Sequence, residues 1–195
     1  MSSPLPTGSS ALFQHKSFLL FLLSRSFSRF SSQIASVAVG WQIYDLTGSA
    51  FALGMVGLVQ FLPTLLLVFV AGDTADRYER KRVAQVCLLA EALTTLFLAC
   101  GAYSGSLTVV QIFIAMAVLG TAGAFESPTI AAMLPLIAPE GSLQRATAIS
   151  SGAAQLATIT GPAIGGLAYA LAPSAAYGIM GAFAFLPRLA SAWSA

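Results

Sequence analysis

Four charged residues lie within or near long apolar runs of the sequence: Arg25, Arg29, Glu91 and Glu126. If a helix begins at Phe18, Arg29 lies about 16 Å along it. Glu91 lies roughly 12 Å after the start of its apolar run, and Glu126 lies roughly 12 Å before the end of its own. Charges at such depth in a membrane are costly and are usually paired. These four residues are therefore candidates for a polar path through an otherwise apolar bundle.

Polar and small residues recur on one helical face of the first apolar run: Arg25, Arg29, Ser32, Ser36 and Gly40, with Gln33 alongside. Steps of three and four residues place side chains on the same side of a helix. We expect this face to meet water or a polar partner. The alternative is that Arg25 extends to the membrane interface while the serines only permit close packing.

A second stripe of small and polar residues follows the fifth run: Ser151, Gln155, Thr158, Pro162, Gly165 and Tyr169. Pro162 frees one backbone carbonyl, and Gly161, Gly165 and Gly166 allow a bend and a close neighbour. A moving helix and a statically packed helix would both have this composition. Both interpretations stay open.

The composition excludes an ordinary soluble domain. The chain has 195 residues, of which 57% are hydrophobic and 8% are charged, against roughly 25% charged in soluble domains. Membrane lipid must therefore surround most of it. The net charge of +2 provides no basic surface for nucleic acid.

Apolar runs of spanning length recur along the chain, and we predict an all-α polytopic membrane protein with six transmembrane helices. Residues 1–16 form a polar tail, and residues 17–195 form the six-helix bundle. The predicted spans are Phe18 to Ile43, Ala50 to Ala71, Val83 to Tyr103, Leu107 to Met133, Ala146 to Leu171 and Ala175 to Leu189. The last span is the weakest, because Pro187 and Arg188 interrupt it.

Basic residues lie on one side of the predicted bundle. The turns "DLTGS", "GAYSGS" and "APS" contain no Lys or Arg, whereas Lys16, Arg145 and the connection from Gly72 to Val83 are basic. The positive-inside rule therefore predicts that both termini lie in the cytoplasm.

The connection "GDTADRYERKRV" contains seven charged residues among its twelve. Its acids, Asp73 and Asp76, interleave with Arg77 and Arg80, which favours a charged latch between helix ends, and Gly72 would let two helices meet closely. A simple orientation signal remains an alternative for the basic cluster Arg80 to Arg82.

These residues carry a family resemblance. Gly72, Ala75, Asp76, Arg77, Arg80 and Lys81 match the loop motif G-x-x-x-D-R-x-x-R-K of the major facilitator superfamily. The segments "VGWQIYDLTGSAFALGMVGL" and "GTAGAFESPTIAAMLP" resemble the branch of enterobactin exporters and transmembrane secretion effectors. Gly161, Pro162, Gly165 and Gly166 match the G-P-x-x-G-G part of the antiporter motif of the superfamily.

The resemblance implies the N-terminal half of a twelve-helix transporter, arranged as a 3+3 repeat in a bacterial inner membrane. It implies export of a small amphipathic molecule, such as a siderophore or a drug-like compound, by alternating access, with proton coupling as an option and no cofactor. The implied cytoplasmic gating motif is Gly72, Asp73, Asp76, Arg77, Arg80 and Lys81, and the implied helix-bending motif is Gly161, Pro162, Gly165 and Gly166.

For the substrate pathway we expect Arg25, Arg29, Gln33, Glu126 and Gln155. Because the first and fourth helices adjoin the central cavity in the resembled family, Glu126 should pair with Arg25 or Arg29. The third helix lies peripherally in that fold, so Glu91 is expected to be structural and to support the basic loop.

An intramembrane enzyme is disfavoured because the only histidine, His15, precedes the first span and no metal or phosphate motif is present. A transport-inactive fragment or a self-associating six-helix protein stays open. Either the missing C-terminal half or a second copy would be needed for a full cavity.

Overall fold

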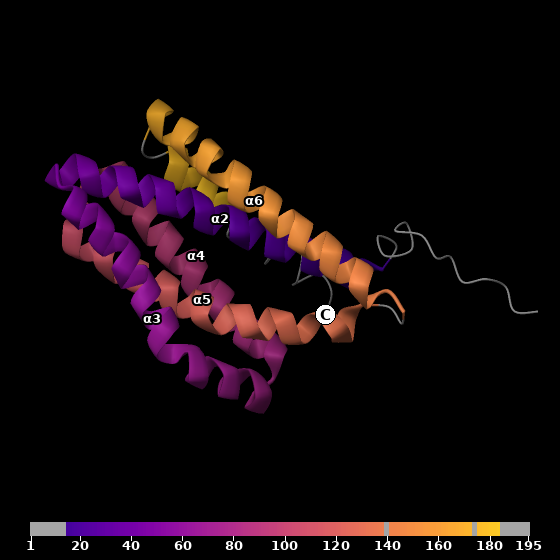
Figure 1. The fold of residues 1–195 in the computed structure, drawn as a ribbon. Coiled ribbons are helices and arrows are strands. Elements are labelled where there is room, and N and C mark those ends of the chain that lie inside the picture. Colours follow the sequence, from indigo (N-terminus) through magenta and orange to yellow (C-terminus); the bar gives the residue numbers. More distant parts are fainter. Residues whose placement is uncertain (1–14, 139–140, 173–174, 184–195) are drawn as a thin grey trace, which may run out of the picture.

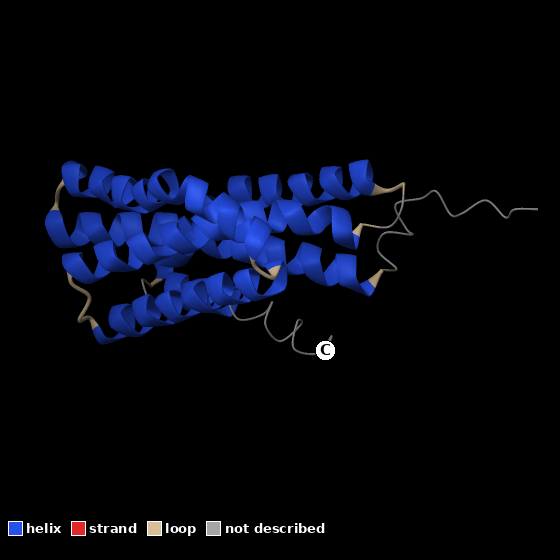
Figure 2. Ribbon diagram, turned by 90° about the horizontal axis from the view of Figure 1, so that it is seen from below, coloured by secondary structure: helices blue, strands red, loops and turns tan. Residues whose placement is uncertain are grey.

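The computed structural model describes residues 15–138, 141–172 and 175–183, without the side chains at positions 75 and 76. All regular structure in these ranges is helical (Figures 1 and 2), as the sequence predicts. The helices are α2 (Lys16–Thr47), α3 (Ala50–Arg77), α4 (Arg80–Ser104), α5 (Val109–Ile137) and α6 (Leu143–Leu171). Residues 175–183 are also helical, and the rest of the sixth predicted span lies outside the described residues.

Three of the described helices are long and apolar enough to cross a membrane. They are Ala50–Thr74 of α3, Arg80–Ser104 and Val109–Ile137, with mean hydropathies of 2.2, 1.9 and 1.8. Both α2 and α6 fall outside this group because they carry the charged, hydroxyl and amide residues of the two predicted polar stripes. The count of six spans therefore stays a prediction.

Glycine ends two of the helices at the predicted turns. Gly48 has φ 62° and Gly105 has φ 64°, a left-handed conformation that glycine adopts without the steric cost of a Cβ atom. The following helices begin at capping residues, because Ser49 Oγ accepts a hydrogen bond from the Ala52 amide and Thr108 forms a capping box with Gln111. These turns connect antiparallel neighbours.

The helices associate mainly in two groups. In one, α2 packs along α6; in the other, α5 packs against both α3 and α4 (Figure 1). Residues 175–183 join the first group, since Ser31 Oγ donates to the Met180 carbonyl and Phe183 packs on Phe27 and Phe30. Contacts from α2 to α3 and α5 are much fewer, so the boundary between the groups is looser than either group.

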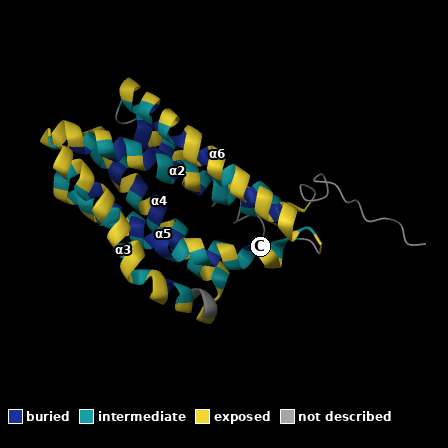
Figure 3. Ribbon diagram, in the orientation of Figure 1, coloured by how far each residue is buried: buried dark blue, intermediate teal, exposed yellow. Residues whose placement is uncertain are grey.

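Buried residues concentrate where the helices face one another, and α3 is largely exposed (Figure 3). Phe51 and Phe69 of α3 are 78% and 87% exposed. An apolar surface of this extent is not stable in water, so lipid or another protein surface must cover it.

Close helix packing depends on glycine at three positions. A Cβ atom on Gly120 of α5 would overlap the backbone carbonyl of Gln60 in α3. In α6, a Cβ atom would lie 2.6 Å from Gln33 Cβ at Gly161 and 3.0 Å from Ile34 Cα at Gly165. Such separations are too short for carbon atoms, so glycine is required where these backbones meet.

We expect Gly120→Ala to push α3 away from α5 and to lower the free energy of unfolding by about 1–3 kcal/mol. The matched control is Gly123→Ala on the same helix, where an added Cβ meets nothing within 4 Å. The control should be neutral or stabilising by about 0.5–1 kcal/mol. Thermal unfolding of the purified chain in detergent measures both variants, and equal midpoints would contradict the packing at Gly120.

Candidate functional site

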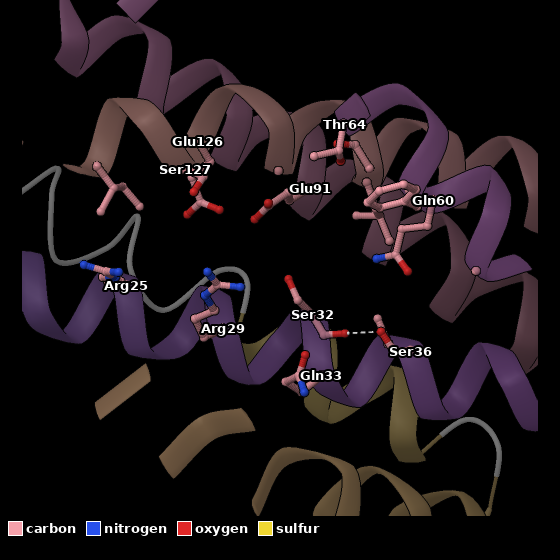
Figure 4. Close-up of a pocket in the computed structure, with 17 residues that line it drawn as sticks. Arg25, Arg29, Ser32, Gln33, Ser36, Gln60, Thr64, Glu91, Glu126 and Ser127 are labelled. Carbon is pink, nitrogen blue, oxygen red and sulfur yellow. Dashed lines mark hydrogen bonds between the residues drawn. The ribbon is translucent and has the colours of Figure 1, made fainter. Parts of the chain in front are cut away.

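A polar cavity opens at the looser boundary between α2 and the group of α3, α4 and α5. Its volume is about 410 Å³. Its polar lining residues are Arg25, Arg29, Ser32, Gln33, Ser36, Gln60, Thr64, Glu91, Glu126 and Ser127 (Figure 4). Phe61, Leu119 and Ile130 add apolar surface. We refer to this space as the polar cavity.

The polar face predicted on the first helix lines this cavity. Figure 4 shows Arg25, Arg29 and Ser32 along one side of α2, opposite the acids of α4 and α5. Four of the five expected pathway residues meet here: Arg25, Arg29, Gln33 and Glu126. Gln155 is different, because it is exposed on α6 and does not line the cavity.

Both intramembrane acids approach one serine hydroxyl. Ser28 Oγ lies 3.1 Å from Glu91 Oε2 and 3.1 Å from Glu126 Oε1. Ser28 is 3% exposed and Glu91 is 8% exposed. The contact joins α2, α4 and α5 at a single point inside the bundle.

The expectation about Glu91 needs correction. Glu91 does not support the basic loop: it faces inward because α4 packs on α5 through the face that carries Cys87, Glu91 and Thr95, which are all buried. The four-residue spacing of Cys87, Glu91 and Thr95 in the sequence already predicts that they share one helical face. Ser28 was missed as well, although its steps of three from Arg25 and four to Ser32 place it on the predicted polar face.

The expected ion pair between Glu126 and Arg25 or Arg29 is absent among the described side chains, where no such N–O distance is within 4.0 Å. The close approach of α2 at Ser28 places a hydroxyl beside the carboxyl instead. Arg25 Nη1 donates to Ser150 Oγ on α6 at 2.8 Å. Arg29 is exposed and points into the cavity (Figure 4).

The glycines of the expected helix-bending motif in α6 differ in how closely they approach α2. Gly161 and Gly165 face α2 at close range, as described above, and Gln33 Nε2 donates to the Thr158 carbonyl at 3.3 Å beside them. At Gly166 an added Cβ would lie 3.8 Å from Val37 Cγ1, an ordinary contact. Pro162 lies inside the helix, which continues to Leu171. The geometry thus gives Gly161 and Gly165 a packing role.

The charged connection forms local contacts. Arg77 Nε lies 2.7 Å from Asp73 Oδ1 within α3, and both side chains are exposed. Arg80 Nη1 donates to the Ala132 carbonyl of α5 at 3.4 Å, which links two helices. The side chain of Asp76 lies outside the described residues.

Two further residues of the expected gating motif lie apart from these contacts. An added Cβ on Gly72 would meet nothing within 4 Å, so the expected close helix contact does not occur within the described part of this chain. Lys81 lines a second cavity of about 330 Å³ between α2, α4 and α5, together with Arg25 and Glu126.

Ser28→Ala removes the hydroxyl that both acids contact. We expect the free energy of unfolding to fall by about 1–3 kcal/mol, because a buried carboxyl loses its donor. Adding Glu126→Gln should recover part of this loss, since it removes one of the two acids and its amide can donate a hydrogen bond.

Ser26→Ala is the control, because Ser26 Oγ only donates to the Leu22 carbonyl of its own helix. It should change stability by less than about 0.5 kcal/mol. Thermal unfolding in detergent is measured for the unchanged chain, Ser28→Ala, Glu126→Gln and the double variant, which complete the cycle, and for the Ser26→Ala control. Equal losses for Ser26→Ala and Ser28→Ala would argue against a special role for Ser28.

Comparisons with known proteins agree with a membrane transporter. The transmembrane secretion effector family matches residues 7–195. Macrolide efflux protein A of Streptococcus pyogenes is 27% identical over 154 residues, the Staphyloferrin A transporter of Staphylococcus aureus 29% over 160, and the multidrug efflux pump Tap of Mycolicibacterium fortuitum 28% over 155.

These alignments cover 79%, 82% and 76% of this chain but 38% of each relative. The chain thus spans less than half the length of the relatives it matches. The family match, by contrast, extends over nearly the whole sequence. The chain therefore belongs to the transmembrane secretion effector family of the major facilitator superfamily, a family of membrane transporters rather than enzymes.

Proposed function

We propose that this chain supplies the N-terminal half of an exporter that moves a small amphipathic molecule across a bacterial plasma membrane by alternating access. The polar cavity carries this proposal. Its arginine, glutamate, glutamine and hydroxyl side chains gather on four helices of a chain in which only 8% of residues are charged. Polar groups are retained inside apolar bundles mainly where they bind or move something.

The lining of the cavity supports an amphipathic substrate. Guanidinium, amide and hydroxyl groups can orient a polar part, and Phe61, Leu119 and Ile130 can cover an apolar part. The matched relatives are named for macrolide efflux, staphyloferrin A transport and multidrug efflux. We therefore propose a siderophore or a drug-like compound as substrate. Proton coupling forms part of the proposal, with Glu91 and Glu126 as the ionisable groups in the cavity.

The proposed architecture has residues 17–195 forming six spans as a 3+3 repeat, with both termini in the cytoplasm. Helix contacts support the repeat. In such a repeat, α2, α3 and α4 correspond in order to α5, α6 and the sixth helix. The contact of α2 with α6 then corresponds to the contact of α5 with α3. These are the two most extensive contacts between the described helices. In this architecture the exposed apolar surface of α3 faces a second half of the transporter or lipid.

A self-associating six-helix protein is the second candidate. The exposed apolar surface of α3 favours it, because a second copy of the chain could cover that surface. The two candidates differ in one respect that can be measured: a self-associating protein needs no other half to transport.

Export by cells tests the proposal. The chain is expressed in a bacterial strain that lacks its main efflux pumps, alone and together with the C-terminal half of a staphyloferrin A transporter. Accumulation of a panel of amphipathic probes, anionic, neutral and cationic, is measured, with copurification of the two halves as the assembly control. We expect lower accumulation only when both halves are present.

Export by the chain alone, together with a crosslinked dimer in membranes, would favour the self-associating candidate. Unchanged accumulation despite copurification of the halves would contradict the exporter proposal.

A substitution in the cytoplasmic motif should reduce transport while it leaves the free energy of unfolding almost unchanged. Asp73→Asn breaks the exposed Asp73–Arg77 pair, which should change the free energy of unfolding by less than about 0.5 kcal/mol. If the motif gates the transporter, export should nevertheless fall by about tenfold, because the closed arrangement becomes less stable by roughly 1.4 kcal/mol. Glu79→Gln is the matched control, since the Glu79–Arg82 pair is equally short and also exposed. Equal export by both variants would contradict a gating role for Asp73.

A further inference from the structure

The charges of the polar cavity do not cancel. Among the described residues, its titratable lining groups are Arg25 and Arg29 of α2, Glu91 of α4 and Glu126 of α5, and α3 contributes only the neutral polar residues Gln60 and Thr64. Cys87 lies one turn before Glu91 and is buried, and Lys81 lines the neighbouring cavity. Whether the cavity is neutral or positive depends on how many protons the two acids hold.

The contacts of Ser28 set a lower limit on that number. A hydroxyl has one hydrogen, so Ser28 donates to one carboxyl group at a time. The second contact at 3.1 Å becomes a hydrogen bond only if the other carboxyl carries a hydrogen and donates it to Ser28 Oγ. Two ionised carboxylates beside one buried oxygen would repel each other, and no arginine nitrogen lies within 4.0 Å of either among the described side chains. The pair therefore holds at least one proton and at most one negative charge.

At least one positive charge then remains in excess, and its place is Arg29. Arg25 is held by its hydrogen bond to Ser150 Oγ, which is buried. Arg29 forms no ion pair within 4.0 Å among the described residues, is exposed, and points into the cavity (Figure 4). A guanidinium presents donors in a planar fork that fits a carboxylate or a phosphate.

We propose that the polar cavity binds an amphipathic anion and that Arg29 receives its anionic group. This inference rests on the proposed export function and specifies the substrate class. The anionic group lies at Arg29, the neighbouring Ser32 and Gln60 offer further hydrogen bonds, and the apolar part lies on Phe61, Leu119 and Ile130. The carboxyl groups of Glu91 and Glu126 together hold at most one negative charge, which attracts a cation. The two guanidinium groups of Arg25 and Arg29 outweigh it, so the excess charge favours the anion.

Direct binding tests the substrate class. All four helices that line the cavity belong to this chain, so the chain in nanodiscs of neutral lipid is a suitable sample. The probes are a dansyl-labelled long-chain carboxylate, its methyl ester and the corresponding amine, each corrected for binding to empty nanodiscs. We expect the carboxylate to bind about tenfold more tightly than the ester, the gain typical of a charge-assisted hydrogen bond.

Arg29→Gln should reduce carboxylate affinity to that of the ester and leave ester affinity unchanged, which also shows that the variant is folded. Glu91→Gln combined with Glu126→Gln should raise carboxylate affinity, because only the double change removes every carboxyl group that can hold a negative charge in the cavity. Arg82→Gln is the control: Arg82 is an exposed arginine paired with Glu79, outside the cavity, and its loss should change no affinity.

Equal binding of carboxylate and ester, tighter binding of the amine, or equal loss of carboxylate and ester affinity in Arg29→Gln would each overturn the inference. In these three cases the cavity still binds amphipathic molecules, so the proposed function stands. If none of the probes binds above the empty-nanodisc level, the cavity is not a binding site, and both the inference and the proposed function fail.

Discussion

Ser28 Oγ contacts the carboxyl groups of Glu91 and Glu126 at 3.1 Å each, at a point where three helices converge. Inside an apolar bundle a carboxyl without a partner is costly. This one hydroxyl satisfies acids from α4 and α5 and so fixes how closely α2 can lie against them. Arg29, the residue after Ser28, is left facing open space, and that space is the polar cavity.

Glycine packing explains why the space persists. Gly120 holds α5 against α3, while Gly161 and Gly165 hold α6 against α2. Each pair is tight because backbones touch, whereas the boundary between the pairs has few contacts. The boundary with fewer contacts holds the polar volume of the cavity, while buried residues that include Ile34, Leu98 and Ile112 form one hydrophobic core across both groups.

The sequence predicted much of the fold because its signals are local. Long apolar runs, the glycines at positions 48 and 105, and the helical spacing of Arg25, Arg29 and Ser32 each depend on residues close together in the chain. The predicted helices and the polar face of α2 therefore agree with the structure. Residues 184–195, which include the end of the sixth predicted span, lie outside the described part, so the extent of that span stays a prediction.

The partners of individual side chains could not be predicted in the same way, because they depend on which helices adjoin. Glu91 was assigned to the loop, whereas the packing of α4 on α5 turns it inward. Gln155 has the spacing of a pathway residue but faces outward on α6. Gly120 and Gly123 look alike in sequence, and only Gly120 meets another backbone.

A polar cavity inside an apolar bundle should admit water. Reaction of single cysteines with a membrane-impermeant maleimide tests this most directly, in a chain whose native Cys87 and Cys100 are replaced by alanine. Ser32→Cys and Gln60→Cys lie in the cavity, and Leu66→Cys lies on the apolar surface of α3, where Leu66 is 66% exposed. We expect fast labelling at positions 32 and 60 and slow labelling at position 66; equal rates at all three positions, or faster labelling at position 66, would contradict a polar cavity within an apolar bundle.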